Sequence, residues 1–302
     1  MAALHDHHHH HETLGGAAFA VAVAINVFLT FVEVSVGLYA GSTALIADAL
    51  HNMSDAAALV IAWWARRVAA RKADGAFTFG YRRAELVAAV VNLTALIVLA
   101  LSLANEAVMR LFDPVEVHGG AVAIASVVAI VVDIGTAWLL WKLAKGSLNL
   151  KAAFLHNLSD AGFSVAVLIG GLVVLKTGMV WIDSALTLAL AVLMIVPSLS
   201  LLKQSARILM LGAPPDIDTE EVRKTLLEIE GVADVHHLHF WQIDESTKSV
   251  EAHLTTRNTA PENLSRIISE ARAKVLERHQ IAHGTYQVEP AQSSCDDGDH
   301  HA

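Results

Sequence analysis

Cysteine is almost missing from this chain: its 302 residues include only Cys295, near the C-terminal end. One cysteine excludes an intrachain disulfide and a zinc site made of clustered thiolates. Any bound metal ion must then be held by histidine and carboxylates. Charged residues are scarce too, at 17% of the chain, and the formal net charge is -9. Since proteins bind nucleic acid through an excess of basic residues, we expect no nucleic-acid partner.

Apolar residues are abundant instead. Hydrophobic residues make up 54% of the chain and the mean hydropathy is +0.49, which indicates a membrane protein. A bilayer core about 30 Å thick is crossed by about 20 apolar residues in a helix. Six runs of about that length predict six transmembrane helices, at approximately 16–38, 43–66, 84–111, 118–143, 150–175 and 180–202.

Basic residues predict which side of the membrane each connector faces. They crowd the second connector, the fourth connector and the exit from the sixth run, whereas the other connectors offer little more than Arg110 and Lys176. Because basic connectors stay in the cytoplasm, we expect both termini to be cytoplasmic. The basic residues are Arg66, Arg67, Arg71, Lys72, Arg82, Arg83, Lys142, Lys145, Lys151, Lys203 and Arg207.

A seven-residue string occurs twice within the apolar runs. Residues 50–56 and 155–161 are identical except that Met53 in the first copy is Leu158 in the second. His51 and Asp55 share one helix face, as do His156 and Asp160, because residues four apart are neighbours on a helix. Ionisable groups are costly at this depth, roughly 3 kcal/mol, and usually mark a pathway. Two such helices side by side present the ligands of a tetrahedral zinc site.

Further acids lie in the apolar runs, among them Glu33, Asp48 and Asp133. Asp48 is one turn before His51, but the second copy of the string has Ala153 at the equivalent place. We therefore expect Asp48 to support helix packing or a ligand instead of binding metal. Asp133 is an acid in the fourth run, where it could tune nearby proton chemistry.

Beyond Arg207 the pattern becomes that of a soluble domain. After the linker 212–215, the pattern predicts helices at 219–230 and 261–278 and strands at 232–243, 249–256 and 285–289. Asp218 and Glu221 form a plausible helix start. This order, helix-strand-strand-helix-strand, is a small α/β ferredoxin-like sandwich. It is small enough that dimerisation would help to stabilise it.

The expected fold class is therefore an α-helical membrane protein with six transmembrane helices and a C-terminal α/β domain. We divide the chain into a His-rich cytoplasmic tail at 1–14, a transmembrane domain at 15–208, a cytoplasmic metal-binding and dimerisation domain at 209–290, and a disordered acidic and His-rich tail at 291–302. The run His7 to His11 fits either a natural metal-collecting tail or a purification tag.

Histidines cluster in the soluble domain. Strand alternation predicts that His237 and His239 share one face of the first strand and that His236 takes the other. With Glu251 and Glu289 nearby in sequence, the histidines make regulatory metal binding a reasonable hypothesis. The six are His236, His237, His239, His253, His279 and His283.

Most of the chain resembles the cation diffusion facilitator family of zinc transporters, particularly the bacterial cobalt-zinc-cadmium resistance branch. The resemblance rests on several motifs in a fixed order rather than on any one of them. They are Gly41-Ser42, Ala47-Asp48-Ala49, His51-x-x-x-Asp55, residues 79–85, His156-x-x-x-Asp160, residues 236–241 and Ala252-His253.

This resemblance implies a homodimer in a bacterial inner membrane. Each protomer would hold zinc, and sometimes cadmium or cobalt, between the second and fifth spans and export it by alternating access in exchange for protons. The implied ligands of the transport site are His51, Asp55, His156 and Asp160. In the soluble domain, His236, His253 and Glu289 match positions where relatives bind metal, and Gln287 replaces a usual ligand. His237 and Gln287 are counted with them as candidate metal residues. No organic cofactor is implied.

Two regions of the chain depart from the family pattern. A metal site in the second connector would fall at Asp74, Phe77 and Tyr81, two of which cannot act as histidine ligands, so we expect that site to be absent. Arg83 matches a residue that forms a charge pair in relatives. The stretch expected opposite it, residues 209–211, contains no acid.

Two other functions are alternatives to proton-coupled zinc transport. An intramembrane zinc-dependent hydrolase would need a general base such as the glutamate of His-Glu-x-x-His, and the sequence lacks that motif. A passive divalent-metal channel is poorly distinguished by sequence. Antiport has a simple physical basis, because protons and zinc compete for the same histidine and aspartate side chains.

Overall fold

The computed structural model describes residues 16–143 and 148–290, so the predicted tails at 1–14 and 291–302 lie outside the described residues. Within the helices, the side chains of 16–23, 26, 139–143, 148–154, 156 and 157 are also outside the description. The chain forms two compact units. One contains the residues up to Ile61 together with Asn92–Leu199, and the other contains Ala62–Val91 and the residues from Ser200.

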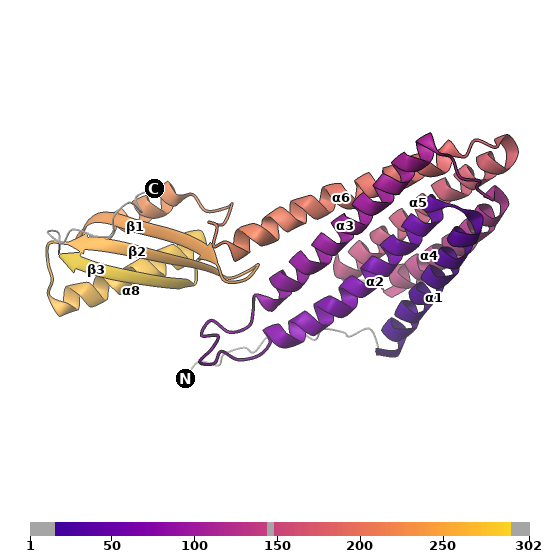
Figure 1. The fold of residues 1–302 in the computed structure, drawn as a ribbon. Helices are drawn as coiled ribbons and strands as arrows, with labels where there is room; N and C mark the ends of the chain where they lie inside the picture. The colour runs from indigo at the N-terminus through magenta and orange to yellow at the C-terminus, as the bar shows by residue number, and fades with distance from the viewer. Residues whose placement is uncertain (1–15, 144–147, 291–302) are drawn as a thin grey trace. The chain divides into compact units, whose positions relative to one another are not determined.

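Within residues 16–143 and 148–290, six long helices form where the apolar runs predicted them (Figure 1). Five contain a stretch long and apolar enough to cross a membrane, and α1 contributes a shorter apolar stretch at Val27–Ala40. The predicted six-helix membrane architecture is thereby confirmed. The helices are α1 at Gly16–Ala40, α2 at Thr43–Ala69, α3 at Ala84–Phe112, α4 at Gly119–Leu143, α5 at Leu148–Thr177 and α6 at Trp181–Leu209.

Small residues let these helices approach one another closely. A Cβ atom on Gly171 of α5 would lie 3.0 Å from the carbonyl oxygen of Gly119, at the start of α4. Alanines at positions 40, 44, 47 and 100 are fully buried where helices meet. Close backbone approach at small residues is how helices pack in a membrane, where the hydrophobic effect does not drive them together. One helix, α6, contains an internal proline, Pro197.

The soluble domain contains two helices and a three-stranded sheet, which confirms its predicted fold. In the sheet order β1-β2-β3, β1 pairs antiparallel with β2, and β2 pairs parallel with β3. The parallel pair requires a crossover connection, which α8 supplies. The elements are α7 at Thr219–Leu227, β1 at Val232–Gln242, β2 at Lys248–Thr256, α8 at Pro261–His279 and β3 at His283–Pro290.

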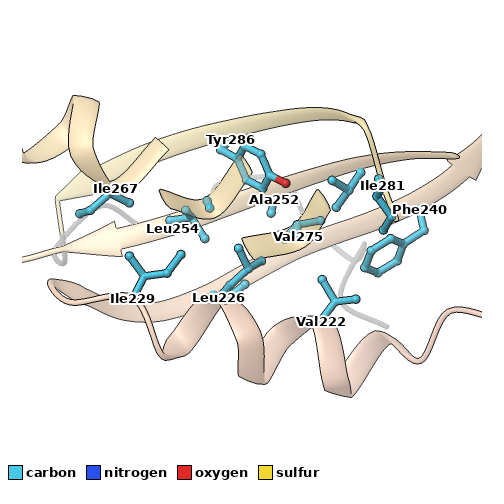
Figure 2. Packing of buried hydrophobic residues seen from close by; sticks show 13 residues of the cluster. Val222, Leu226, Ile229, Phe240, Ala252, Leu254, Ile267, Val275, Ile281 and Tyr286 are labelled. Carbon is cyan, nitrogen blue, oxygen red and sulfur yellow. The ribbon is translucent and has the colours of Figure 1, made fainter. Parts of the chain in front are cut away.

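An apolar core lies between this sheet and its helices. Figure 2 shows Val222 and Leu226 of α7 on the side that faces the strands, and both are fully buried with Leu254 of β2 and Ile267 of α8. The predicted start of α7 is confirmed, because the Asp218 side chain accepts a hydrogen bond from the backbone nitrogen of Glu220 at 2.8 Å. That bond satisfies one of the amides left unpaired at the start of a helix.

Strand β1 corrects one prediction. Its pairing with β2 is irregular between His236 and His239, and His237 has a φ of 50°. The His236 and His237 rings both approach the ring of His253, with centroid distances of 5.4 and 4.6 Å. The expectation that His236 and His237 lie on opposite faces is therefore wrong, because a β-bulge interrupts the alternation on which it depended.

Candidate metal sites

The first candidate site lies between α2 and α5. The Nε2 atom of His51 is 3.7 Å from Oδ2 of Asp55, one turn further along α2, and 3.7 Å from Oδ1 of Asp160 on α5. The histidine and both aspartates are partly buried. Two carboxylates from different helices therefore converge on one imidazole nitrogen, which is a donor set suited to a borderline divalent ion such as zinc.

The structure brings three of the four predicted ligands together. His156 lies in α5 one turn before Asp160, but its side chain is outside the described part of the structure. Its assignment as the fourth ligand stays a prediction.

Two buried acids lie beside this site. Asp48 of α2 and Asp133 of α4 are almost fully buried, and both accept from the Ser164 hydroxyl of α5, at 3.1 and 3.3 Å. A hydroxyl has one proton to donate, so it serves one carboxylate at a time. A supporting position for Asp48 is predicted from the sequence, whereas the contact with Ser164 is not. Ser164 lies four residues after Asp160, on the same face of α5, and this spacing could have indicated that it lies near the site.

The second candidate site is in the soluble domain. His236, His253 and Glu289 each offer one ligand atom, and these atoms lie within 4.8 Å of one another. The Nδ1 atom of His253 is 2.6 Å from Oε1 of Glu289, and the Nε2 atom of His236 is 3.9 Å from the same oxygen. Within the described residues, that buried Nε2 has no hydrogen-bond partner. An imidazole nitrogen left without a partner beside a carboxylate fits a metal ligand.

Two other residues predicted for this site hold different positions. The Gln287 side-chain amide donates a hydrogen bond to Oε1 of Glu289 at 3.4 Å, so it supports a ligand in this arrangement. The His237 ring lies between those of His239, at 4.5 Å, and His253. His237 is thus close enough to join the cluster, although it is not one of the three residues whose ligand atoms already lie together.

Asp74 accepts hydrogen bonds from three groups in the connector between α2 and α3. Its Oδ1 accepts from the backbone nitrogens of Ala76 and Phe77, both at 2.9 Å, and its Oδ2 accepts from the Tyr81 hydroxyl at 2.7 Å. The bond from Tyr81, followed by those from the two amides, lowers the pKa of Asp74 below its usual value. The connector positions considered in the sequence for a metal site thus hold an aspartate that is hydrogen-bonded to a tyrosine.

Arg83 finds partners that the sequence did not suggest. Its guanidinium donates to the carbonyl oxygens of Gln242 and Ile243, at 3.0 and 3.2 Å. The neighbouring Arg82 lies 3.3 Å from Oδ2 of Asp244 in the turn between β1 and β2. Backbone carbonyls, rather than an acid near residues 209–211, therefore bind Arg83.

Family models match nearly the whole described chain. A model of the cation efflux transmembrane domain matches residues 19–210, and a model of the cation efflux protein cytoplasmic domain matches residues 214–291.

Several known proteins are similar in sequence over most of their length. The zinc transporter ZitB of Yersinia pestis is 36% identical over 271 residues, covering 89% of this chain and 86% of that protein. The metal cation efflux system protein CzcD of Cupriavidus metallidurans is 32% identical over 289 residues, covering 95% and 89%. A cadmium, cobalt and zinc/H(+)-K(+) antiporter of Bacillus subtilis is 32% identical over 260 residues, covering 85% and 84%.

One solved structure is also similar. It is the metal-bound C-terminal domain of the CzcD transporter from Cupriavidus metallidurans, which is 29% identical, covers 24% of this chain and 99% of that chain, and has a TM-score of 0.23.

Proposed function

Because the chain belongs to the cation efflux family of membrane transporters, we propose that it exports zinc from the cytoplasm in exchange for protons. The observation that carries this proposal is the convergence of Asp55 and Asp160, from two membrane helices, on Nε2 of His51. The family membership makes the chain a transporter and not an enzyme. Relatives named for zinc, cadmium and cobalt support these ions as substrates.

Proton exchange follows from the chemistry of the ligands. Zinc binds neutral imidazole and ionised carboxylate, so a bound zinc ion excludes protons from His51 and both aspartates. Histidine titrates near neutral pH, so the same groups can carry protons on the return step. A relative named as a proton-linked antiporter supports this coupling. The excess of basic residues in the second and fourth connectors supports a cytoplasmic location for both termini.

The soluble domain would act as a metal sensor and as a dimer contact. The unpartnered Nε2 of His236 beside His253 and Glu289 supports the binding of a regulatory zinc ion there. The match to the cytoplasmic domain of cation efflux proteins supports dimerisation.

Transport by purified protein in liposomes tests the proposal. We expect an imposed pH gradient to drive zinc across the membrane and Asp160→Ala to abolish that flux. Ser159→Ala is the matched control, because the Ser159 hydroxyl bonds the Leu155 carbonyl of its own helix. Normal flux in Asp160→Ala would contradict the site. Zinc flux in the wild type that ignored the pH gradient would indicate a passive channel.

A further inference from the structure

Three carboxylates lie together among the membrane helices, beside the candidate site between α2 and α5. Glu33 of α1 is 0% exposed, Asp48 of α2 is 1% exposed and Asp133 of α4 is 2% exposed. The charges of Asp48 and Asp133 both interact with that of Glu33. The Ser164 hydroxyl of α5 joins two of the acids, because it lies 3.1 Å from Oδ2 of Asp48 and 3.3 Å from Oδ2 of Asp133. We call the three acids and Ser164 the buried acid cluster.

Glu33 lacks the hydrogen bonds that an ionised carboxylate needs. Within the described residues, neither of its oxygens has a hydrogen-bond partner, and neither has Oδ1 of Asp48. Asn52 of α2 lies near Glu33, yet its side-chain nitrogen has no hydrogen-bond partner among those residues either. Buried polar atoms are nearly always paired, so these carboxylate oxygens require a specific explanation.

Basic side chains do not balance the charge of these acids. The sequence of α1 contains no lysine, arginine or histidine, and the basic residue of α4 that is nearest to Asp133 in sequence is Lys142, more than two turns further along. The ionisable groups that act on Asp48 are Asp133 of α4, His51 of α2 and Asp160 of α5. His51 is the one base among these described groups. Several negative charges beside one histidine are unfavourable in a low-dielectric interior, so the cluster must be neutralised.

Asp183 of α6 shows how a buried acid is stabilised when donors surround it. Its Oδ1 accepts from the Ser42 hydroxyl at 2.5 Å, and its Oδ2 accepts from the Thr43 backbone nitrogen at 2.7 Å and the Thr43 hydroxyl at 2.8 Å. Hydrogen bonds to the charged form of a carboxyl group favour that form. Asp183 is therefore suited to carry a charge, whereas Glu33 is suited to carry a proton.

The burial of the cluster favours protons over a second metal ion. The side chains of His51, Asp55 and Asp160 are partly exposed, whereas the acids of the cluster are almost fully buried. A hydrated metal ion needs an opening and room for its ligands. A proton needs neither, because it moves along chains of hydrogen-bonded groups, as it does through the buried acids of pumps and transporters.

Ser164 supplies one link of such a chain. When Asp48 is protonated and Asp133 is ionised, the O–H bond of Asp48 breaks as Oγ of Ser164 accepts its proton. The Ser164 hydroxyl gives its own proton to Oδ2 of Asp133 in the same step. One O–H bond is lost at Asp48, one forms at Asp133, and the Ser164 hydroxyl is left unchanged.

We propose that Glu33 and Asp133 form a proton site, separate from the metal ligands, that holds protons exchanged for zinc. Asp48 and Ser164 connect this proton site to the transport site. A zinc ion there adds positive charge beside the cluster, and a nearby positive charge favours ionised carboxylates. Zinc binding therefore releases protons from the cluster, and zinc release takes them up again. This inference rests on the proposed function, because it assumes that zinc binds at the neighbouring site.

Infrared spectroscopy of the purified, zinc-free protein detects these protons directly, because a protonated carboxyl group has a carbonyl stretch that an ionised carboxylate lacks. We expect this band in the wild type at neutral pH and a loss of intensity in Glu33→Gln and in Asp133→Asn. Each substitution puts an amide of nearly the same shape in place of a neutral acid, so both variants should fold. Size-exclusion chromatography verifies that they do.

Asp183→Asn is the matched control, since Asp183 is a buried acid whose donors suit its charged form. It should leave the band unchanged. If this variant lost its folded fraction, Glu106→Gln takes its place, because Glu106 accepts from Arg110 on the exposed side of α3.

Proton release during zinc binding gives a second readout. A pH-sensitive dye in weakly buffered solution counts the protons released per zinc ion, and the release in Asp160→Ala is subtracted as the contribution of other zinc sites. We expect Glu33→Gln and Asp133→Asn to release fewer protons per zinc ion than the wild type. Their zinc affinity should also depend less steeply on pH, because that dependence reports the number of protons released.

Ser164→Ala tests the link between Asp48 and Asp133. It removes the hydroxyl but no acid, so we expect the infrared band to stay and the zinc flux driven by a pH gradient to fall. Ser126→Ala is the control, because the buried Ser126 hydroxyl bonds the Val122 carbonyl of its own helix. Equal flux in the two serine variants would contradict the link.

A wild type without the protonated-acid band, or a band unchanged in both Glu33→Gln and Asp133→Asn, would overturn the proton site. Unchanged proton release per zinc ion in both variants would overturn its part in the exchange. The infrared measurement requires no zinc, so its result decides the site even if the wild type moved none. A wild-type protein that moved no zinc would contradict the proposed function separately.

Discussion

At the scale of single residues, the candidate membrane site would combine two kinds of ligand with different tasks. The imidazole of His51 is a borderline ligand that favours zinc over harder ions, whereas the carboxylates of Asp55 and Asp160 supply negative charge. The partial burial of all three leaves them reachable by an ion while reducing competition from water. Selectivity should therefore depend on the imidazole more than on either carboxylate.

Replacing His51 by Asp tests that dependence. An all-oxygen ligand set favours harder ions, so we expect His51→Asp to admit manganese more readily relative to zinc. Competition between the two ions for uptake into liposomes measures the change. Met53→Leu is the control, because the second copy of the string carries Leu158 at that place. An unchanged order of preference would show that selectivity is set outside this side chain.

The candidate site in the soluble domain would separate a ligand from its supporting residue. Glu289 offers an oxygen to both histidines, whereas Gln287 only donates to that oxygen. Loss of a residue that supports a ligand typically weakens metal binding about 10- to 100-fold, so we expect Gln287→Ala to fall within that range. Glu289→Gln should weaken binding further. Zinc titration calorimetry in an Asp160→Ala background checks the order, and a larger effect at Gln287 would reverse the two roles.

At the scale of helices and strands, the elements that follow a regular sequence pattern could be predicted. The contacts that interrupt a pattern, or that join distant residues, could not. Hydropathy located all six spans because a bilayer demands long apolar runs, and alternation with turn residues located the three strands. The irregularity of β1 at His237 was not predicted, because the alternation of side chains assumes a regular strand. The hydrogen bond from the Ser42 hydroxyl to the Asp183 carboxylate was not predicted, because 141 residues separate the partners and no local pattern signals such a contact. The fourth transport ligand, His156, remains a prediction from the repeat.

Glycine at the contact of α4 and α5 provides a stability test. A Cβ atom on Gly119 would overlap the carbonyl oxygen of Gly171, so Gly119→Ala should destabilise the protein by about 1–3 kcal/mol. Nothing lies within 4 Å of a Cβ atom on Gly135 in the same helix, so Gly135→Ala should be neutral or stabilise by up to about 1 kcal/mol. Thermal unfolding followed by size-exclusion chromatography compares them. Equal midpoints would contradict the close contact.

The connector between α2 and α3 should respond to pH through Asp74. Because the Tyr81 hydrogen bond lowers the Asp74 pKa in the folded protein, its stabilising effect is present above the ordinary value of 3.8 and is lost as pH falls through the lowered pKa. Tyr81→Phe should shift the Asp74 titration upward toward its ordinary value. Carboxyl-carbon NMR titration measures the shift. A titration unchanged by the substitution would mean that the two backbone amides alone lower the pKa.

At the scale of the whole molecule, the two candidate metal sites lie in different parts of one chain. The membrane site lies in the unit that includes residues 43–61 and 92–199, and the His236 cluster lies in the unit that includes residues from Ser200 onward. A separate sensor can adjust the activity of a transporter without taking part in the transport step. Such an arrangement predicts that the two activities can be separated by mutation.

Deleting the residues from 213 onward tests this separation. We expect the shortened protein to keep some zinc flux but to lose any stimulation by zinc on the cytoplasmic side. Loss of the dimer contact should also lower the fraction of protein with twice the 32.3 kDa mass of one chain, measured by native mass spectrometry. Full zinc-dependent stimulation after the deletion would exclude the soluble domain as the sensor.

Pro197 has a consequence for how α6 can bend. It lies in α6 two residues before Leu199, where the two compact units divide. Proline has no amide hydrogen, so the helix lacks one backbone bond at this point and bends more easily there than elsewhere. When α6 is twisted, it therefore bends near Pro197 before it bends elsewhere. Bending at Pro197 therefore leaves the contacts of Asp183, near the start of α6, with Ser42 and Thr43 undisturbed.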